Sequence, residues 1–451
     1  MGGHAPLRLF ALPQNPLAPQ SQAPRIKPLL LRHRLLEILV KEKKYTMRLV
    51  SEKILESQKG SSWIRRMFEA GIELKRQYGA DKVYDFSLGS PDLRPPAAVI
   101  QTLRGLAEKV DVPAGLGYMP NAGYPAAREA LALWAAREQG VEIPAENIVV
   151  TVGAAGALNC LFKAVLLPGD EVLCPAPYFV EYGAYCGNFG GVLKAIPSRP
   201  STFQLDLEGL RAAITERTRI LLINSPNNPA GVIYTREELK ALADILQEAN
   251  RGREQPILLA ADEPYRFLAF DGQQVPSVFP AYPYSVVCSS FSKNLGLAGE
   301  RVGYVVVNPA LPKEESGQLV AGLILTNRTI GYVNAPCIGQ KLIIGAVAQL
   351  EETLRGQQAQ REVYARRRAL MASILDEAKI PYQMPAGTFY FFPKAPHGQD
   401  DLAFVQKLAE QRILAVPGSG FGYPGHFRLA LCVEENVIRN SREGFLAAAQ
   451  A

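Results

Sequence analysis

Residues 285–304 read SVVCSSFSKNLGLAGERVGY, and this run says most about the fold. Its first part, Ser285–Ser289, is an apolar run of the kind that forms a buried strand. Lys293 follows the predicted strand end among small hydroxyl and glycine residues, where a lysine can form a Schiff base with an aldehyde cofactor. Arg301 adds a planar cation suited to a phosphate. A lone lysine is far more often a surface residue, so the interpretation depends on the surrounding sequence.

Similar apolar runs recur along the chain on both sides of Ser285–Ser289. They are continuous rather than alternating, which is typical of strands buried on both faces. Helical stretches such as 236–248 lie between several of them. The alternation predicts an α/β fold with a mostly parallel, seven-stranded sheet covered by helices. The other predicted strands are 148–152, 171–175, 191–196, 219–224, 257–262 and 302–307.

The pattern changes beyond about residue 340. A long charged helix at 346–379 is followed by an apolar run at 387–392, a helix at 402–411 and a strand at 427–433. These elements predict a smaller α+β domain at 336–451, after a large domain at 96–335.

The N-terminal part of the chain divides into two segments. Residues 1–46 are rich in Pro, Gln, Ala and Leu without periodicity, so we expect a disordered, dispensable extension, with Met47 as a candidate start. Residues 47–95 are expected to form an arm that contributes to the small domain. The arm is predicted to hold a helix from Met47 to about Tyr78 and an extended segment at 83–89.

The net charge of +6 belongs to the N-terminal end of the chain. Residues 1–46 hold eight Lys/Arg and two Asp/Glu, so the remaining residues are neutral as a whole. A neutral body gives no electrostatic case for binding DNA or RNA. No uninterrupted apolar stretch is long enough to span a bilayer. We therefore expect neither a nucleic-acid nor a membrane partner.

Cysteine and histidine usage narrows the chemistry further. The six cysteines show no CxxC spacing and mostly lie in apolar runs, as expected for buried thiols in a reducing cytoplasm. Beyond residue 46 only His397 and His426 remain, too few for a His-rich metal site or an obvious Ser-His-Asp triad. We expect a cytoplasmic protein without a metal.

Polar residues at the ends of the predicted strands are the candidates for a site, because ligands of open α/β sheets bind beyond the carboxyl ends of the strands. The first strand runs into Gly153–Leu158, where small residues opening a helix expose N–H groups to a phosphate. The fourth strand runs into the proline-rich turn Asn224–Gly231, where an asparagine amide can donate to a ring oxygen. Asp262 is costly to bury without a positive partner, and Tyr265 follows it closely.

Taken singly, each of these features is also consistent with an ordinary turn or helix start. Together they supply a phosphate site, a carboxylate for a protonated ring nitrogen, donors for a ring oxygen and a Schiff-base lysine. Pyridoxal 5′-phosphate requires this set of groups.

Over about residues 80–435 the chain resembles the class I and II aminotransferases, which are fold-type I pyridoxal-phosphate enzymes related to aspartate aminotransferase. The resemblance rests on S-F-S-K-N-x-G-x-x-x-E-R-V-G around Lys293, N-N-P-A-G at 227–231 and D-E-P-Y at 262–265. It implies that Lys293 carries the cofactor as an aldimine, that Asp262 pairs with the ring nitrogen and that Tyr265 contacts the ring oxygen.

The resemblance also implies the remaining contacts. Gly89 in L-G-S-P-D and Arg428 in F-R-L-A-L, together with Asn228, are implied to bind the substrate. Tyr118, in Y-M-P-N-A-G-Y-P, is implied to reach the phosphate bound in a neighbouring copy, so a homodimer is expected. The implied cofactor contacts are Ala154, Ala155, Tyr178, Asn228, Asp262, Tyr265, Ser290, Ser292, Lys293, Arg301 and Tyr118.

The implied reaction is transfer of an amino group from an L-amino acid to a 2-oxo acid such as 2-oxoglutarate. The E-R-V-G-Y end of the lysine motif favours transamination over the C–S lyases and other Cα- or Cβ-reacting enzymes of the fold, which remain the alternative. A transcription regulator built on this fold is not expected, because 46 irregular residues are too few for a DNA-binding domain. A nicotinamide site at 418–422 is rejected, because no strand–turn–helix surrounds that run.

The donor amino acid is less well specified. Arg328 precedes V-N-A-P at 333–336 and is a candidate for binding a distal carboxylate, although an exposed arginine at a helix end fits it equally well. Aspartate is therefore one candidate donor, with alanine and aromatic amino acids beside it.

Overall fold

A computed structural model describes residues 49–52, 54–55 and 63–450. The extension expected at 1–46 and most of the first part of the helix expected from Met47 lie outside the described residues. The rest of that helix is α3 (Trp63–Tyr78), which ends where predicted.

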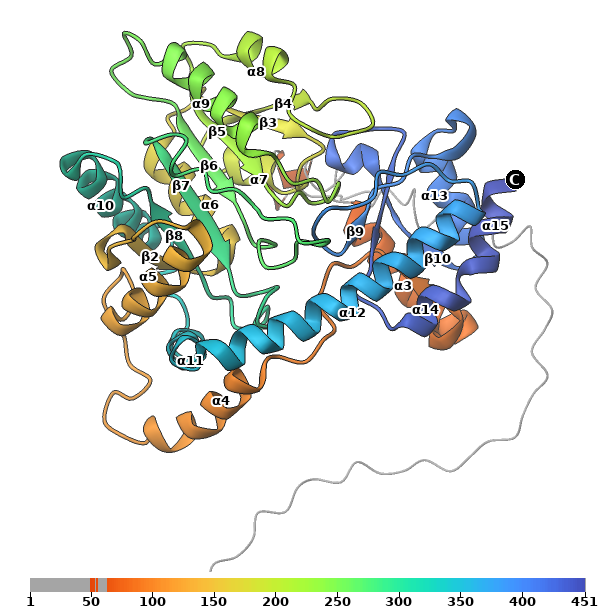
Figure 1. The fold of residues 1–451 in the computed structure, drawn as a ribbon, viewed down its shortest axis with the longest axis horizontal. Coiled ribbons are helices and arrows are strands. Elements are labelled where there is room, and N and C mark those ends of the chain that lie inside the picture. Colours follow the sequence, from red (N-terminus) through yellow and green to blue (C-terminus); the bar gives the residue numbers. More distant parts are fainter. Residues whose placement is uncertain (1–48, 53, 56–62, 451) are drawn as a thin grey trace, which may run out of the picture. The chain divides into compact units, whose positions relative to one another are not determined.

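The predicted seven-stranded, mostly parallel sheet is confirmed, in the order β2-β8-β7-β6-β5-β3-β4 (Figure 1). Only β8 is antiparallel to its two neighbours. Every residue of the inner strands is buried except one in β5, whereas β4 at the edge is largely exposed, as its weaker apolar pattern suggested. The strands are β2 (Ile148–Thr151), β3 (Glu171–Ala176), β4 (Val192–Pro197), β5 (Thr218–Asn224), β6 (Leu258–Asp262), β7 (Ser285–Ser290) and β8 (Gly303–Val307).

Both faces of the sheet carry an apolar core, because successive side chains of each strand point to opposite faces. Leu221 and Ile223 of β5 belong to one core cluster, and Ile220 and Leu222 belong to the other. The continuous Val/Ile/Leu runs are explained by this two-sided burial. The covering helices are α5 (Pro125–Gln139), α6 (Gly153–Val165), α7 (Tyr182–Gly187), α8 (Leu207–Ala213), α9 (Arg236–Ala249) and α10 (Lys313–Thr329).

The C-terminal part of the chain forms smaller sheets. Three short strands pair antiparallel in the order β11 (Val416–Pro417), β12 (Phe427–Ala430) and β9 (Tyr390–Phe391). A further pair joins the two ends of the chain, since β1 (Tyr84–Asp85) runs parallel to β10 (Ile413–Leu414). The helices here are α13 (Asp401–Glu410), α14 (Glu435–Asn440) and α15 (Arg442–Gln450).

The extended segment expected at 83–89 forms a strand over β1, and the Phe86 N–H beyond it still donates to the Leu414 carbonyl. The backbone N–H and hydroxyl of Ser87 then donate to the Asp85 carboxylate. One prediction of local structure was wrong. The single helix expected at 346–379 is two helices, α11 (Cys337–Ala348) and α12 (Leu350–Glu377). They break at Gln349, where ψ is 47°, and the Thr353 hydroxyl donates to the Ala346 carbonyl across the break.

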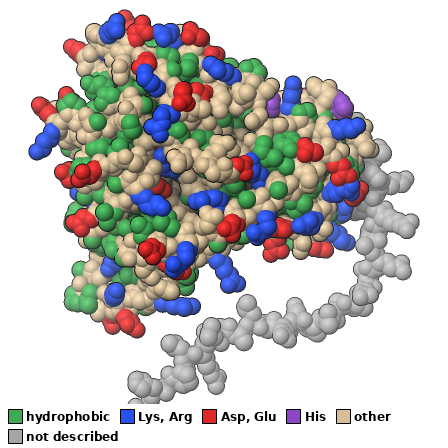
Figure 2. All heavy atoms as spheres, in the orientation of Figure 1, with side chains coloured by type: hydrophobic (Ala, Val, Ile, Leu, Met, Phe, Trp, Pro, Cys, Tyr) green, Lys and Arg blue, Asp and Glu red, His purple; other side chains and the backbone are tan. Residues whose placement is uncertain are grey.

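The long helix α12 connects different parts of the fold. It packs against α11 and α4 (Ala97–Lys109) and, further along, against α14 and α15 (Figure 1). Among the described residues, no helix is long and apolar enough to cross a bilayer. On the face shown in Figure 2, cationic and anionic side chains are interspersed.

Candidate active site

The carboxyl edge of the large sheet gathers most of the candidate residues. The register pairs Asn224 with Asp262, and Asp262 with Cys288, so the ends of β5, β6 and β7 lie side by side. Lys293 follows the end of β7 by three residues. Because β2 is parallel to β7 through the antiparallel β8, the N-terminus of α6 opens at the same edge.

Asp262 is buried, and only one of its two carboxylate oxygens has a hydrogen-bond partner among the described residues. The Tyr182 hydroxyl donates to its Oδ2 at 2.5 Å, and Oδ1 has no hydrogen-bond partner in the described chain. Burial raises the pKa of this carboxyl to about 7, and the bond from Tyr182 acts in the opposite direction. The free Oδ1 is therefore an acceptor that a ligand N–H can satisfy.

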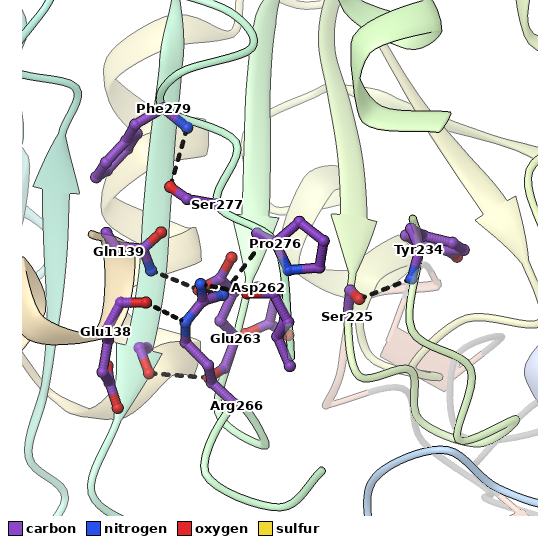
Figure 3. Close-up of polar contacts among 12 residues, drawn as sticks. Glu138, Gln139, Ser225, Tyr234, Asp262, Glu263, Arg266, Pro276, Ser277 and Phe279 are labelled. Carbon is purple, nitrogen blue, oxygen red and sulfur yellow. Dashed lines mark hydrogen bonds and ion pairs between the residues drawn. The ribbon is translucent and has the colours of Figure 1, made fainter. Parts of the chain in front are cut away.

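The neighbouring carboxylate, Glu263, has its partners within the protein (Figure 3). Arg266 Nη1 donates to Glu263 Oε2 at 3.0 Å, and Gln139 Nε2 donates to the same oxygen at 2.7 Å. Arg266 also donates to the carbonyls of Glu138 and Val275. Of the two adjacent acids, only Asp262 lacks a cationic partner among the described residues.

Lys293 lies in a largely apolar setting. Its Nζ donates to the Gly89 carbonyl at 2.7 Å, and it lies 5.9 Å and 5.7 Å from the ring centres of Tyr265 and Phe389. Burial lowers the pKa of the amine to about 8. About one tenth of the amine is therefore unprotonated at pH 7, the form that a nucleophile or base requires.

Arg428 is a buried cation with unused donors. It is 2% exposed, its Nη1 donates to Asn228 Oδ1 at 3.2 Å, and its Nη2 donates to the Ser87 carbonyl at 2.7 Å. Its Nε has no hydrogen-bond partner among the residues that the structure describes. The guanidinium lies over the rings of Tyr390 and Phe421, at 4.6 Å and 4.9 Å from their centres. Since no carboxylate pairs with it among the described residues, it is suited to an anionic ligand.

Tyr390 links several of these groups. Its hydroxyl lies 3.1 Å from the Tyr265 hydroxyl, and its ring packs on Arg428. A Cβ on Gly89 would overlap with the Tyr390 hydroxyl, so only glycine fits at position 89 without a shift. Burial raises the pKa of Tyr265 well above its usual range. Tyr265 is therefore a neutral donor.

The N-terminus of α6 offers a site for an anion. Ala154 and Ala155 lie in its first turn, where backbone N–H groups have no acceptor within the helix. Gly153 has a φ of +70°, and a Cβ there would lie 2.7 Å from Arg301 Nη2. Ser290 and Ser292 are both buried in the segment that also carries Lys293.

Tyr178 flanks the same edge from the end of β3. Its backbone N–H donates to the Phe421 carbonyl, and its ring lies against Gly422, where a Cβ would come within 2.5 Å of Tyr178 Cε1. The ring stacks on that of Tyr182, with centres 6.5 Å apart.

Two predicted residues do not join this cluster within one copy of the chain. Tyr118 is 92% exposed, and Arg328 is exposed in the last turn of α10. Neither makes a hydrogen bond or ion pair with the other candidates in the described part of the chain. A cavity of about 910 Å³ also lies elsewhere, between α5, residues 266–280 and α12, and none of the candidates lines it.

Sequence reasoning missed Tyr182 and Tyr390. Tyr182 stands four residues after Tyr178, but Tyr178 lies before α7 begins, so helical spacing does not link the two rings. Tyr390 lies in an aromatic run, G-T-F-Y-F-F, where nothing distinguishes it from core residues.

Comparison with known proteins identifies what this site resembles. Residues 81–444 match the family model described as aminotransferase class I and II. The aspartate/prephenate aminotransferase of Thermus thermophilus is 33% identical over 377 residues, covering 83% of this chain and 92% of that protein. An aminotransferase structure from Eubacterium rectale has a TM-score of 0.83 at 34% identity, covering 90% of this chain and 99% of that one. The Thermus thermophilus aspartate aminotransferase with maleate has a TM-score of 0.79 at 31% identity, covering 89% and 100%.

Proposed function

This chain belongs to the class I and II aminotransferase family, and we propose that it transfers the amino group of an L-amino acid to a 2-oxo acid such as 2-oxoglutarate, with pyridoxal 5′-phosphate bound at the carboxyl edge of the sheet. One observation carries the assignment of the site. The buried, unpartnered Oδ1 of Asp262 and the Lys293 amine with a lowered pKa stand at the ends of adjacent strands. This pair supports a cofactor that needs both a ring-nitrogen partner and an amine.

The chemistry of the donors fits pyridoxal phosphate. Asp262 Oδ1 would accept the ring N–H, and that contact would favour the ionised carboxylate that burial alone disfavours. Tyr265 and Asn228 would donate to the ring oxygen, and Tyr178 would stack on the ring. The phosphate would be held by Ser290, Ser292, Arg301 and the first-turn N–H groups of Ala154 and Ala155. When bound, the cofactor supplies an aldehyde that condenses with amines and a ring that withdraws electrons.

Side chains of the protein then bind the substrate and transfer its proton. Arg428, stacked between two rings, binds the α-carboxylate by its free N–H groups, and the Gly89 segment closes the other side of that carboxylate. Lys293 Nζ takes the proton from the substrate's α-carbon and returns it later in the reaction. Its lowered pKa suits both directions of that transfer.

The donor substrate is proposed to be aspartate. The support is the printed name of the Thermus thermophilus relative, together with Arg328 as a candidate for the distal carboxylate. A panel of amino acids assayed against 2-oxoglutarate tests this proposal. Arg328→Ala should selectively impair aspartate turnover, and unchanged aspartate turnover would remove the distal role of Arg328.

A homodimer is proposed on the surface around Tyr118. Leu116 and Val112, each 58% exposed, lie near this tyrosine in sequence, and a cavity of about 260 Å³ is bounded by residues 116–119 and 332–334. Exposed apolar surface of this kind supports contact with a second copy. Light scattering of the purified protein measures the mass directly, and a monomer at micromolar concentration would contradict the proposal.

The division into domains is also proposed as expected from the sequence, at 47–95, 96–335 and 336–451. The parallel pairing of β1 with β10 supports assigning part of the N-terminal arm to the C-terminal domain.

The absence of disulfides among the six cysteines supports a reducing cytoplasmic setting.

One incubation separates transamination from its rival. The protein is mixed with pyridoxal phosphate, an amino acid and 2-oxoglutarate, and glutamate is measured. Glutamate formed in equal amount to the new 2-oxo acid supports the proposal. Thiol release from a sulfur amino acid without any need for 2-oxoglutarate would favour a C–S lyase instead. Lys293→Ala is the inactive control for both assays.

A further inference from the structure

We propose that Arg367 is a positioning residue that sets the spacing between the two chain segments that bind the substrate's α-carboxylate. This inference rests on the proposed function, which assigns that carboxylate to Arg428 and the Gly89 segment. Arg367 itself does not touch either group. It acts through Asp92 and through the backbone of Leu431.

Arg367 contacts both segments at once. It lies on α12 and is 4% exposed, and its Nη1 and Nη2 donate to the two Asp92 carboxylate oxygens at 2.8 Å and 2.7 Å. Nη1 also donates to the Leu431 carbonyl at 3.0 Å. The planar guanidinium thus fixes the direction of each partner as well as its distance.

The two partners stand in equivalent places along the chain. Asp92 lies three residues after Gly89, and Leu431 lies three residues after Arg428. Three residues of chain span at most about 10 Å. A displacement of Asp92 therefore also displaces Gly89, and a displacement of Leu431 also displaces Arg428. Two bonds also join the segments directly: Arg428 Nη2 donates to the Ser87 carbonyl, and the Ala430 N–H donates to the Phe86 carbonyl. Arg367 adds a third link, beyond Gly89 and Arg428.

Other residues on the same face of α12 hold the first segment. The Tyr364 hydroxyl donates to Asp92 Oδ1 at 3.3 Å, and Gln360 Nε2 donates to the Arg94 carbonyl at 3.0 Å. These residues and Arg367 are spaced by four and three positions, so they lie along one face of the helix. Side chains of α12 therefore hold the 89–94 segment in place through hydrogen bonds.

The next residue along α12 provides a matched control. Arg368 also pairs with an aspartate, donating to the two Asp271 oxygens at 3.3 Å and 2.8 Å. Asp271 lies in the 266–280 segment, which contains no candidate site residue. Loss of this pair removes an arginine–aspartate pair from the same helix, one whose aspartate is more exposed than Asp92, without touching the substrate-binding segments.

The experiment compares the wild type with Arg367→Met, Arg367→Lys, Asp92→Asn and Arg368→Met. Three quantities are measured for each: KM and kcat for the amino acid and the oxo acid, the Kd of maleate as a non-reacting dicarboxylate, and the Kd of pyridoxal phosphate. Arg367→Met and Asp92→Asn should each raise both KM values and the maleate Kd about tenfold or more, because a misplaced binding group is costly. The kcat should change by about twofold at most, since the carboxylate is bound equally before and during the reaction.

Arg367→Lys should recover part of the lost affinity for substrates and maleate, because lysine keeps the charge but cannot form the bidentate hydrogen bond. Arg368→Met should leave all three quantities near wild-type values. Equal effects of Arg367→Met and Arg368→Met, or a loss of cofactor affinity as large as the loss of maleate affinity, would show a purely structural role and overturn the inference. Unchanged KM values and an unchanged maleate Kd in Asp92→Asn would also overturn the inference. This variant tests the inference even if Arg367→Met does not fold.

Failure of the proposed function has a different signature. A wild type that binds maleate but makes no glutamate refutes transamination. The maleate measurements still test Arg367 in that case.

Discussion

Replacing Tyr182 with Phe tests the electrostatic setting of Asp262. The Tyr182 hydroxyl donates to Asp262 Oδ2 at 2.5 Å, and this bond opposes the burial that raises the carboxyl pKa to about 7. Phenylalanine keeps the packing of the ring against Phe179 and removes only the donor. In the cofactor-free protein the pKa of Asp262 should therefore rise further.

The size of the effect follows from that one bond. A hydrogen bond to a charged group contributes about 1.5–3 kcal/mol, and one pKa unit corresponds to about 1.4 kcal/mol, so the carboxyl pKa should rise by about one to two units. At pH 7 the ionised fraction then falls from about one half to between about one tenth and one hundredth. If only the ionised carboxylate accepts the ring N–H, the apparent affinity for pyridoxal phosphate falls about five- to fiftyfold.

The assay is a titration of cofactor-free protein with pyridoxal phosphate, followed by absorbance between pH 6 and pH 10. The ratio of variant to wild-type Kd cancels the titration of the free cofactor. That ratio should be large at pH 7 and approach a constant small value above the raised pKa, where Asp262 is ionised in both proteins. Tyr185→Phe, on the same helix, is the control, because Tyr185 makes no hydrogen bond to Asp262. A ratio that is independent of pH would refute the reasoning.

Three further outcomes are expected. Gly89→Ala should raise the KM for both substrates at least tenfold in steady-state assays, because a Cβ would displace the Tyr390 hydroxyl; a KM within twofold of wild type would contradict this. In cofactor-free protein, Asp262→Asn should gain stability relative to wild type as the pH rises from about 4 to 7, because the native carboxyl, with its raised pKa, holds a proton that the unfolded chain releases; urea unfolding across that range would show a flat difference if the pKa were normal. Thr235→Ala should cost about 1 kcal/mol in urea unfolding, because its hydroxyl accepts the Glu238 N–H and the Glu238 carboxylate accepts the Thr235 N–H; an unchanged midpoint would mean that the N-cap contributes nothing.

The large sheet and the acidic and basic groups at its edge were predictable from the sequence, because they depend on local rules. Continuous apolar runs predict strands buried on both faces, and parallel strands place their carboxyl ends at one edge. Asp262 and Lys293 therefore came together as soon as their strands were recognised. Their separate environments, one carboxylate with a tyrosine donor and one amine beside aromatic rings, did not follow from those rules.

The remaining features depend on contacts between distant parts of the chain. Tyr390 meets Tyr265 across 125 residues, and Arg367 meets Asp92 across 275. No periodicity encodes such a meeting, since it arises only when α12 and β9 are packed against the sheet. The break at Gln349 was missed for a related reason. The hydroxyl of Thr353 donates to a carbonyl seven residues earlier, across the break between the two helices. No helix-breaking residue marks that position in the sequence.

The antiparallel strand β8 has a consequence for how this enzyme family can change. Because β8 returns beside β7, the chain leaves the edge of the sheet at Ser290 and comes back at Gly303, and Lys293 and Arg301 both lie in that one connection. The separation of Lys293 and Arg301 is set by the single loop that connects the paired strands β7 and β8. Displacement of α12, β9 or β12 changes the distance from Arg428 to Lys293 but leaves that loop intact. Substitutions on those elements can therefore accumulate while the loop that carries Lys293, the proposed attachment point of the cofactor, is preserved.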